Sequence, residues 1–212
     1  MTASECLKVQ LLPYAWFEDL ANSSSAACWM RETPLVKFFC YHRDRPGSAA
    51  LRAELIEAHW SYMDGFELIA RGPTLDGETP TGSVHIVDLP DVAAVREFAF
   101  AEPNYQAGAY RDVLIRRWDD VLGRTMWEFP GDPEAANLYL VLGLGSGPAV
   151  DLEPSATESL ISYGPLWSDD GTAWLGTAAL VQAADADAAR GILTAENYAA
   201  IEVHYWQPGG RS

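Results

Sequence analysis

Apolar and polar residues follow two different periods in the first half of the chain, and these periods predict its secondary structure. Runs of β-branched and aromatic residues predict strands over residues 35–42, 66–73, 83–89 and 110–118. Apolar residues at helical spacing predict helices over residues 52–66 and 91–102. We expect Ser48 to cap the first helix, Asp91 to lie in the first turn of the second, and residues 74–82 to form a turn-rich connection. The order β-α-β-β-α-β is the ferredoxin-like arrangement.

The first of these helices carries one histidine, His59, in its apolar stripe. Ile56 and Tyr62 lie three residues away from it, and Leu55 and Met63 lie four residues away, so the five side chains share one helix face. A histidine at such a position is either a core residue satisfied by a hydrogen bond or a functional group that exchanges a proton. The helix alone leaves both interpretations open.

The second half of the chain repeats marks of the first half. LYLVLGLG at residues 138–145 resembles the first strand, and IEVHYW near the end resembles VLIRRW. Gly82 and Glu102 are 20 residues apart, as are Gly176 and Glu196. Matching marks at matching spacing predict a tandem duplication.

The second copy is shorter than the first. The start of its first strand and the glycine of its Gly-Pro pair are 26 positions apart (138 and 164), against 37 in the first copy (35 and 72), and it has no counterpart of His59. We therefore expect it to lack most of its first helix. The predicted organisation is an N-terminal extension (1–33), a first module (34–122), a linker (123–137) and a degenerate second module (138–212).

Composition narrows the function classes. The net charge is −16, from 30 acidic against 14 basic residues, which argues against binding to nucleic acid or to anionic membranes. No run of about 18 apolar residues and no secretory leader is present, so we expect no membrane span. Cys6, Cys28 and Cys40 form no metal-type or redox-type pair, which favours a cytoplasmic protein without disulfides.

Several stretches between residues 35 and 120 occur in the order of a known pattern: DRPGSAALRAELIEAHW, ARGPTLDG, GSVHIVD, AEPNYQAGAY and IRRW. In this order they resemble the YCII-related family of small ferredoxin-like proteins, in which a histidine follows an arginine by seven residues, as His59 follows Arg52 here. The resemblance implies a dimeric α+β barrel, in which two modules pair their sheets around a cleft. With the duplication, it predicts an α+β fold of two tandem βαββαβ modules that pair as a pseudo-dimer within one chain; further homodimerisation is left open.

The resemblance also implies a reaction chemistry. In this family the histidine and the aspartate of a D-P-Y motif are regarded as an acid/base pair, and some members look like lyases or dehydrohalogenases that act on ring substrates. Glu102 stands at the position of that aspartate, and Asn104, followed by Tyr105, stands at the position of the tyrosine. We therefore expect His59 to be the general base or acid and Glu102 to be its orienting partner.

The remaining candidate residues are predicted to contact the substrate: Tyr62, Arg71, Ser83, His85 and Tyr105. In the third strand Val84 and Ile86 alternate with His85, so His85 points into the cleft between the modules if the aliphatic pair packs under the helices. A histidine that is merely packed in the interface is an equal alternative. Arg71 either binds a substrate oxygen or forms a surface salt bridge.

No cofactor and no metal are predicted, because the four histidines are scattered and no nucleotide-binding or nucleophile motif is present. Five tryptophans either line an apolar pocket or pack in the core: Trp60, Trp118, Trp167, Trp174 and Trp206. The sequence thus predicts a cofactor-independent acid/base enzyme, a lyase or isomerase, acting on a small cyclic or aromatic-like metabolite by elimination, dehydration or isomerisation. The alternative is a non-catalytic small-molecule-binding or scaffolding protein of the same fold.

Overall fold

The computed structural model describes residues 35–132, 135 and 137–211; the predicted extension over residues 1–33 lies outside these residues. The strands in the described part are β1 (Val36–Asp44), β2 (Leu68–Asp76), β3 (Thr79–Leu89), β4 (Tyr110–Trp118), β5 (Leu138–Leu144), β6 (Leu160–Trp167), β7 (Trp174–Gln182) and β8 (Ala200–Trp206). The helices are α1 (Ala49–Glu54), α2 (Ile56–Met63), α3 (Val92–Phe100), α4 (Pro103–Gln106) and α5 (Ala186–Arg190), with short 3₁₀ turns at Met126–Glu128 and Ala195–Asn197. None of the helices described is long and apolar enough to cross a membrane.

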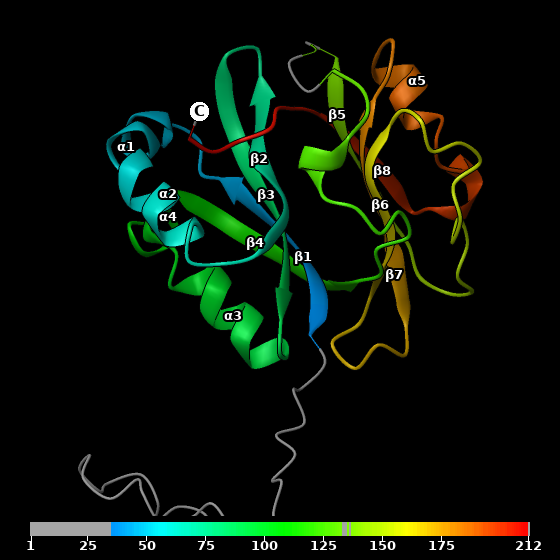
Figure 1. The fold of residues 1–212 in the computed structure, drawn as a ribbon, viewed down its shortest axis with the longest axis horizontal. Helices are drawn as coiled ribbons and strands as arrows, with labels where there is room; N and C mark the ends of the chain where they lie inside the picture. The colour runs from blue at the N-terminus through cyan, green and yellow to red at the C-terminus, as the bar shows by residue number, and fades with distance from the viewer. Residues whose placement is uncertain (1–34, 133–134, 136, 212) are drawn as a thin grey trace, which may run out of the picture. The chain divides into compact units, whose positions relative to one another are not determined.

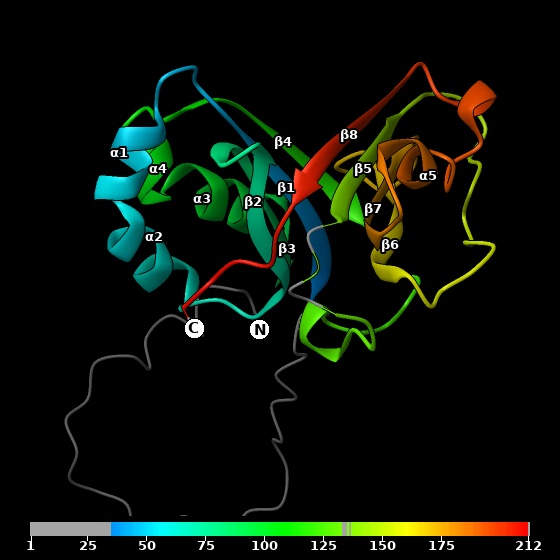
Figure 2. The ribbon, with the colours of Figure 1, turned by 90° about the horizontal axis from the view of Figure 1, so that it is seen from above.

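The eight strands close into one antiparallel barrel in the order β1-β3-β2-β8-β5-β7-β6-β4 (Figure 1). Four strands of the first half, β4-β1-β3-β2, are followed around the barrel by four strands of the second half in the corresponding order, β8-β5-β7-β6. Helices α1 to α4 lie on the outer side of the first group, and α5 lies beside the second group (Figure 2). The predicted α+β class is therefore confirmed.

Two seams join the halves, and each contains few backbone pairings. In one seam Thr74 and Leu75 of β2 pair with Trp206 and Tyr205 of β8. In the other, Arg117 and Trp118 of β4 pair with Trp167 and Leu166 of β6. Both seams place the last residue of a strand, Trp118 or Trp206, in the barrel interior, where each is almost completely buried. Side-chain packing across the interior therefore contributes much of the stability of the closed barrel.

Strand β1 is buried on both faces, which explains its continuous apolar sequence. Phe39 and Tyr41 point into the barrel interior, whereas Phe38 and Cys40 pack under the helices of the first half. Alternation along a strand sends successive side chains to opposite faces, so a strand with two covered faces needs apolar residues at every position.

The predicted helix over residues 52–66 is divided in two. Leu55 has non-helical backbone angles (φ −93°, ψ 5°) and separates α1 from α2. Arg52, His59 and Met63 are nevertheless buried on the same side, because spacings of seven and four residues return to one helix face. Ser48 takes the predicted N-cap position, but its hydroxyl makes no capping hydrogen bond.

Two further expectations about the first half need correction. Asp91 is not in the first turn of α3 but is its N-cap, where its carboxylate accepts a hydrogen bond from the backbone N–H of Ala94 at 2.9 Å. Residues 74–82 are not a loose connection, because β2 and β3 continue through most of them as a tight hairpin. Gly77 supplies the positive φ (59°) of its turn.

The second half is simpler than the first. Residues 145–159, which connect β5 to β6 and are all described, contain no helix, as the shorter spacing predicted. The segment before β5 packs against the barrel, with Met126 and Phe129 in the interior core. Within the described residues, only the first half therefore carries a pair of helices that could cover a site beside its sheet.

Candidate active site

A histidine–carboxylate pair lies between the sheet and the helices of the first half. His59 projects from α2, and its Nδ1 is 2.6 Å from Oε1 of Glu102, which precedes α4. Glu102 has no exposed surface and His59 only 8%. The structure thus brings together the two residues that the sequence predicted to be partners, from positions 43 residues apart.

The carboxylate of Glu102 is fixed by a further set of donors. Glu102 is the N-cap of α4, and its Oε2 accepts the backbone N–H of Tyr105 at 2.8 Å. Its Oε1 also accepts a hydrogen bond from Nδ2 of Asn104 at 3.0 Å. Burial by itself raises the pKa of Glu102, but the hydrogen bond and charge of His59 and the backbone donors outweigh it and hold this pKa below its ordinary value. Glu102 is therefore ionised at neutral pH.

A cavity of about 520 Å³ opens beside this pair. Its walls come from α1, α2, β2, β3 and the segment after β8, and most of them are apolar. The polar side chains that line it are Arg52, His59, Arg71, Ser83 and His85. An apolar cavity of this size with a few convergent polar groups suits a small, largely apolar molecule.

Arg52 lines this cavity, although the sequence did not predict it as a residue of the site. It is 8% exposed, and its Nη1 lies 2.8 Å from Oδ2 of Asp44, while its Nη2 donates to Oγ of Ser83 at 2.6 Å. Its seven-residue spacing from His59 marked the helix face that both residues share. The buried guanidinium places positive charge in the cavity wall and fixes the hydroxyl of Ser83.

His85 lies in the cavity wall but does not point into the cleft between the two halves. Val84 and Ile86 pack in the barrel interior, so the alternation turns His85 outward toward the helices. Its ring centroid lies 5.5 Å from that of His59 and 5.4 Å from that of His42. The condition for the predicted direction, that Val84 and Ile86 pack under the helices, is therefore not met, and the cavity that His85 lines is the one beside His59.

The two other histidines of this cluster are neutral at physiological pH. Burial holds the pKa of His85 well below its ordinary value. Burial likewise lowers the pKa of His42 to about 4, although the carbonyl of Ala99, 3.1 Å from its Nε2, acts in the opposite direction. Nδ1 of His85 is buried and has no hydrogen-bond partner among the described residues.

The two tyrosines predicted as substrate contacts do not line the cavity. The hydroxyl of Tyr62 donates to the carbonyl of Phe98 at 3.1 Å. The ring of Tyr105 packs against Phe100, with centroids 4.9 Å apart. Tyr105 contributes to the site only through its backbone N–H.

Arg71 combines the two roles considered for it. It lines the cavity, and its Nη1 also forms an ion pair with Oδ1 of the more exposed Asp64 at 3.2 Å. Its Nε donates to the carbonyl of Gly209 at 3.2 Å. Arg71 is thus held at the cavity edge from both sides.

Of the five tryptophans, Trp60 alone lines this cavity. Trp118 and Trp206 pack in the barrel interior, and Trp174 packs in the separate core of the second half. Trp167 is half-buried and lines a small cavity near one seam. Core packing therefore accounts for most of them.

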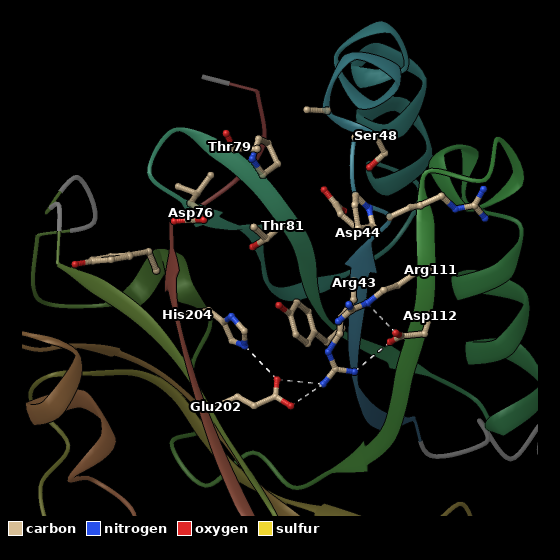
Figure 3. Close-up of a pocket in the computed structure, with 18 of the residues that line it drawn as sticks. Arg43, Asp44, Ser48, Asp76, Thr79, Thr81, Arg111, Asp112, Glu202 and His204 are labelled. Carbon is tan, nitrogen blue, oxygen red and sulfur yellow. Dashed lines mark hydrogen bonds and ion pairs between the residues drawn. The ribbon is translucent and has the colours of Figure 1, made fainter.

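A second, larger cavity of about 1000 Å³ lies at the junction of β1, β4, β8 and the β2–β3 hairpin. Figure 3 shows Arg43 at its centre, bridging Asp112 at 3.1 Å and Glu202 at 3.2 Å, while His204 lies 3.1 Å from Glu202. The guanidinium of Arg43 is thus paired with both carboxylates. Among the described residues, no three His, Cys, Asp or Glu side chains gather as they would around a metal ion.

Residues 36–119 match the sequence profile of the YCII-related domain. The matched segment contains both members of the pair, His59 and Glu102, and the other polar residues of the cavity wall. No protein of curated function matches the sequence significantly.

Solved structures with similar folds include two with named activities. The 5-chloro-2-hydroxyhydroquinone dehydrochlorinase of Burkholderia phenoliruptrix AC1100, in complex with 2,5-dihydroxybenzoquinone, is 27% identical with a TM-score of 0.39; the similarity covers 42% of this chain and 98% of that chain. An anthrone oxidase-like protein is 9% identical with a TM-score of 0.47, covering 84% of this chain and 92% of that chain. The first similarity spans less than half of the chain, and the second spans most of it.

Proposed function

Residues 36–119 match the YCII-related domain, and we propose that this segment catalyses cofactor-independent proton transfer on a small, planar cyclic molecule. The observation that carries the proposal is the 2.6 Å contact between Nδ1 of His59 and the fully buried carboxylate of Glu102, beside an apolar cavity. A buried carboxylate that accepts a hydrogen bond from an imidazole sets which ring nitrogen carries the proton, and its charge stabilises the imidazolium that forms when the other nitrogen accepts a proton from a substrate.

The pair determines the direction of proton transfer. Because Glu102 is ionised, it can only accept, so Nδ1 of His59 carries the proton and Nε2 is left with a free lone pair. In the proposed reaction, Nε2 removes a proton from a carbon next to a substrate carbonyl, and the C–H electron pair moves onto the carbonyl oxygen as an enolate. The imidazolium is stabilised by the charge of Glu102.

The second step of the reaction uses the proton that His59 has taken from the substrate. Returning it from Nε2 of His59 to a different carbon gives an isomerisation. Collapse of the enolate with departure of a group from the adjacent carbon gives an elimination or dehydration, in which Nε2 protonates the leaving group. Arg52 and Arg71 line the cavity and supply positive charge for the enolate oxygen, and neutral His85 supplies a hydrogen-bonding group.

Deuterium exchange tests this chemistry without knowledge of the natural substrate. Planar cyclic ketones such as 2-tetralone and 2-indanone are incubated with the protein in D₂O, and loss of their α-proton signals is followed by NMR. We expect His59→Ala to slow the catalysed exchange by about 100-fold and Glu102→Gln to slow it by about 10- to 100-fold.

His204→Ala is the matched control, because His204 also contacts a glutamate, Glu202, but in the other cavity. This variant should exchange at the wild-type rate. Equal exchange in wild type and His59→Ala would contradict the proposal. Binding of the ketones without exchange would instead support the non-catalytic small-molecule-binding protein.

We also propose that the two halves arose by tandem duplication, with modules at residues 34–122 and 138–212 joined by a linker at 123–137. The corresponding strand orders support this, as do the helix caps Asp91 and Asp185, whose carboxylates accept the N–H three residues later. The chain would then form a pseudo-dimer by itself. Separate chains cut within the linker and expressed together should reassemble, whereas failure to associate would weaken this proposal.

A further inference from the structure

The segment that follows β8, residues 207–211, crosses the cavity of the first half. Figure 1 shows this red segment leaving β8 and passing over β2 toward α1 and α2. Pro208, Gly209 and Gly210 form part of the cavity wall. We call residues 207–211 the strap.

One end of the strap is bound to β2 through its backbone. Gln207 donates its N–H to the carbonyl of Pro73 at 3.1 Å, and Gly209 donates its N–H to the carbonyl of Arg71 at 3.0 Å. The side chain of Arg71 returns a hydrogen bond from Nε to the carbonyl of Gly209. The strap therefore continues the pairing of β8 with β2 beyond the barrel.

The close approach of the strap depends on glycine. A Cβ at Gly72 would overlap with the backbone of Gln207 and lie 3.0 Å from the N of Gly209. A Cβ at Gly210 would overlap with the guanidinium of Arg71, and Gly210 also has a φ of 129°. Substitution at either position must displace the strap or the arginine beneath it.

The other end of the strap is anchored on the helix that carries His59. Arg211 donates to Oδ2 of Asp64 at 2.7 Å, to Oγ of Ser61 at 2.9 Å and to Oε2 of Glu57 at 3.2 Å. These groups are solvent-exposed, so each contact is weak and reversible compared with a buried one. The strap is thus fixed along β2 and held to α2 by a cluster that can open.

We propose that the strap controls ligand entry to the cavity of His59, so that the second half of the chain governs access to the site of the first half. With Arg211 bound to α2, the strap bridges β2 and α2 across the cavity. Release of Arg211 lets Gly210 and Arg211 move away from α2 and opens this wall, while Gln207 and Gly209 stay bound to β2. The inference rests on the cavity being the ligand site, as proposed above, but not on any reaction taking place there.

Chemical modification of His59 measures access directly. Diethyl pyrocarbonate acylates unprotonated imidazole nitrogens, and its product at each histidine can be quantified by peptide mass spectrometry. His204 lies in the other cavity and serves as the internal reference. We expect Arg211→Ala to raise the modification rate of His59 relative to His204 by about fivefold, in keeping with loss of an exposed ion-pair cluster.

Arg96→Ala is the matched control, because Arg96 forms an exposed ion pair with Asp169 of the other half at 2.8 Å and does not line the cavity. It should leave the ratio unchanged. The double variant Glu57→Ala/Ser61→Ala removes two of the acceptors of Arg211 from α2 without altering the strap, and it should raise the ratio in the same direction as Arg211→Ala.

Two outcomes distinguish opening of the strap from unfolding of the protein. The fully buried His42 does not line the cavity and reacts only if the fold opens, so its modification in Arg211→Ala would reveal unfolding and leave the double variant to decide. An unchanged ratio of His59 to His204 in a folded Arg211→Ala protein, or in the double variant, would overturn the role of the strap. Because modification needs no turnover, this result is independent of the deuterium-exchange experiment.

Discussion

Asn104 donates from Nδ2 to Oε1 of Glu102 at 3.0 Å, and this is the same oxygen that contacts Nδ1 of His59. Asn104 is itself almost completely buried and also lies 3.4 Å from the hydroxyl of Tyr110. The carboxylate is therefore held in place by a neighbour two residues along the chain as well as by the helix N-terminus that it caps. Its orientation toward His59 does not depend on a bound ligand.

This arrangement makes Asn104 a positioning residue. Asn104→Ala should lower the rate of deuterium exchange about tenfold, which corresponds to the loss of about 1.4 kcal/mol from a hydrogen bond to a charged group. Asn104→Ala should lower kcat and change the pH dependence of kcat. A defect in folding alone would lower only the amount of active protein. Tyr105→Ala is the control, because Tyr105 reaches Glu102 only through its backbone, and this variant should keep the wild-type rate.

The two buried neutral histidines predict a specific sensitivity to mild acid. Burial lowers the pKa of His42 to about 4 and holds that of His85 far below 6.5. Just below pH 6.5 these two side chains therefore bind protons in the unfolded chain but not in the folded protein. The free energy of unfolding is therefore fully retained above pH 6.5 and falls as the pH is lowered toward 4. Each histidine should cost about 1.5 kcal/mol between pH 6.5 and 5.

Urea unfolding at several pH values, followed by tryptophan fluorescence, measures this dependence. His42→Gln and His85→Gln should each lower stability at pH 7 but remove about half of the decline between pH 6.5 and 5. A free energy of unfolding that is flat over this range in the wild type would show that the two histidines do not stay neutral in the folded state.

The sequence predicted the secondary structure and the pairing of His59 with Glu102 more successfully than side-chain directions and long-range contacts. Strand order in the first half followed from residue type and spacing, and the seven-residue step from Arg52 to His59 marked the correct helix face. The direction of His85 could not be obtained in the same way. Because β3 is covered on both faces, the alternation of Val84, His85 and Ile86 is compatible with either orientation.

Contacts between segments that are distant along the chain leave no recognisable pattern in the sequence. The hydrogen bonds of Arg211 to α2 join residues about 150 positions apart and involve side chains that are ordinary on any surface. Asn104 looked like a departure from the D-P-Y motif, and only its contact with Glu102 shows that it supports the carboxylate. Such roles depend on the final positions of the atoms rather than on residue type or period.

The seams of the barrel predict two equivalent stability effects. Trp118 and Trp206 end corresponding strands and are 2% and 1% exposed, and each seam contains only two paired residues on each side. Trp118→Ala and Trp206→Ala should each lower the free energy of unfolding by about 3–5 kcal/mol, because each leaves a large cavity in the interior. Trp127 is 59% exposed, so Trp127→Ala should change stability by no more than about 0.5 kcal/mol in urea unfolding. Similar losses in all three variants would contradict this account of the seams.

Gly72 and Gly164 occupy corresponding positions and predict different functional effects. A Cβ on Gly164 would overlap with the backbone of Asp119, just as a Cβ on Gly72 would overlap with that of Gln207. In both halves the residue after the last strand donates its N–H to a proline carbonyl, at 3.3 Å from Asp119 to Pro165 and at 3.1 Å from Gln207 to Pro73. The two substitutions to alanine should therefore destabilise the protein to a similar extent.

Only Gly72, however, lies under the strap. Gly72→Ala should increase the modification of His59 by diethyl pyrocarbonate relative to His204, because it pushes residues 207–209 away from β2. Gly164→Ala displaces the segment after β4, which lines no part of the His59 cavity, and should leave that ratio unchanged. Equal ratios in the two folded variants would show that contact with β2 does not keep the strap over the cavity, and anchoring by Arg211 would then have to hold it alone.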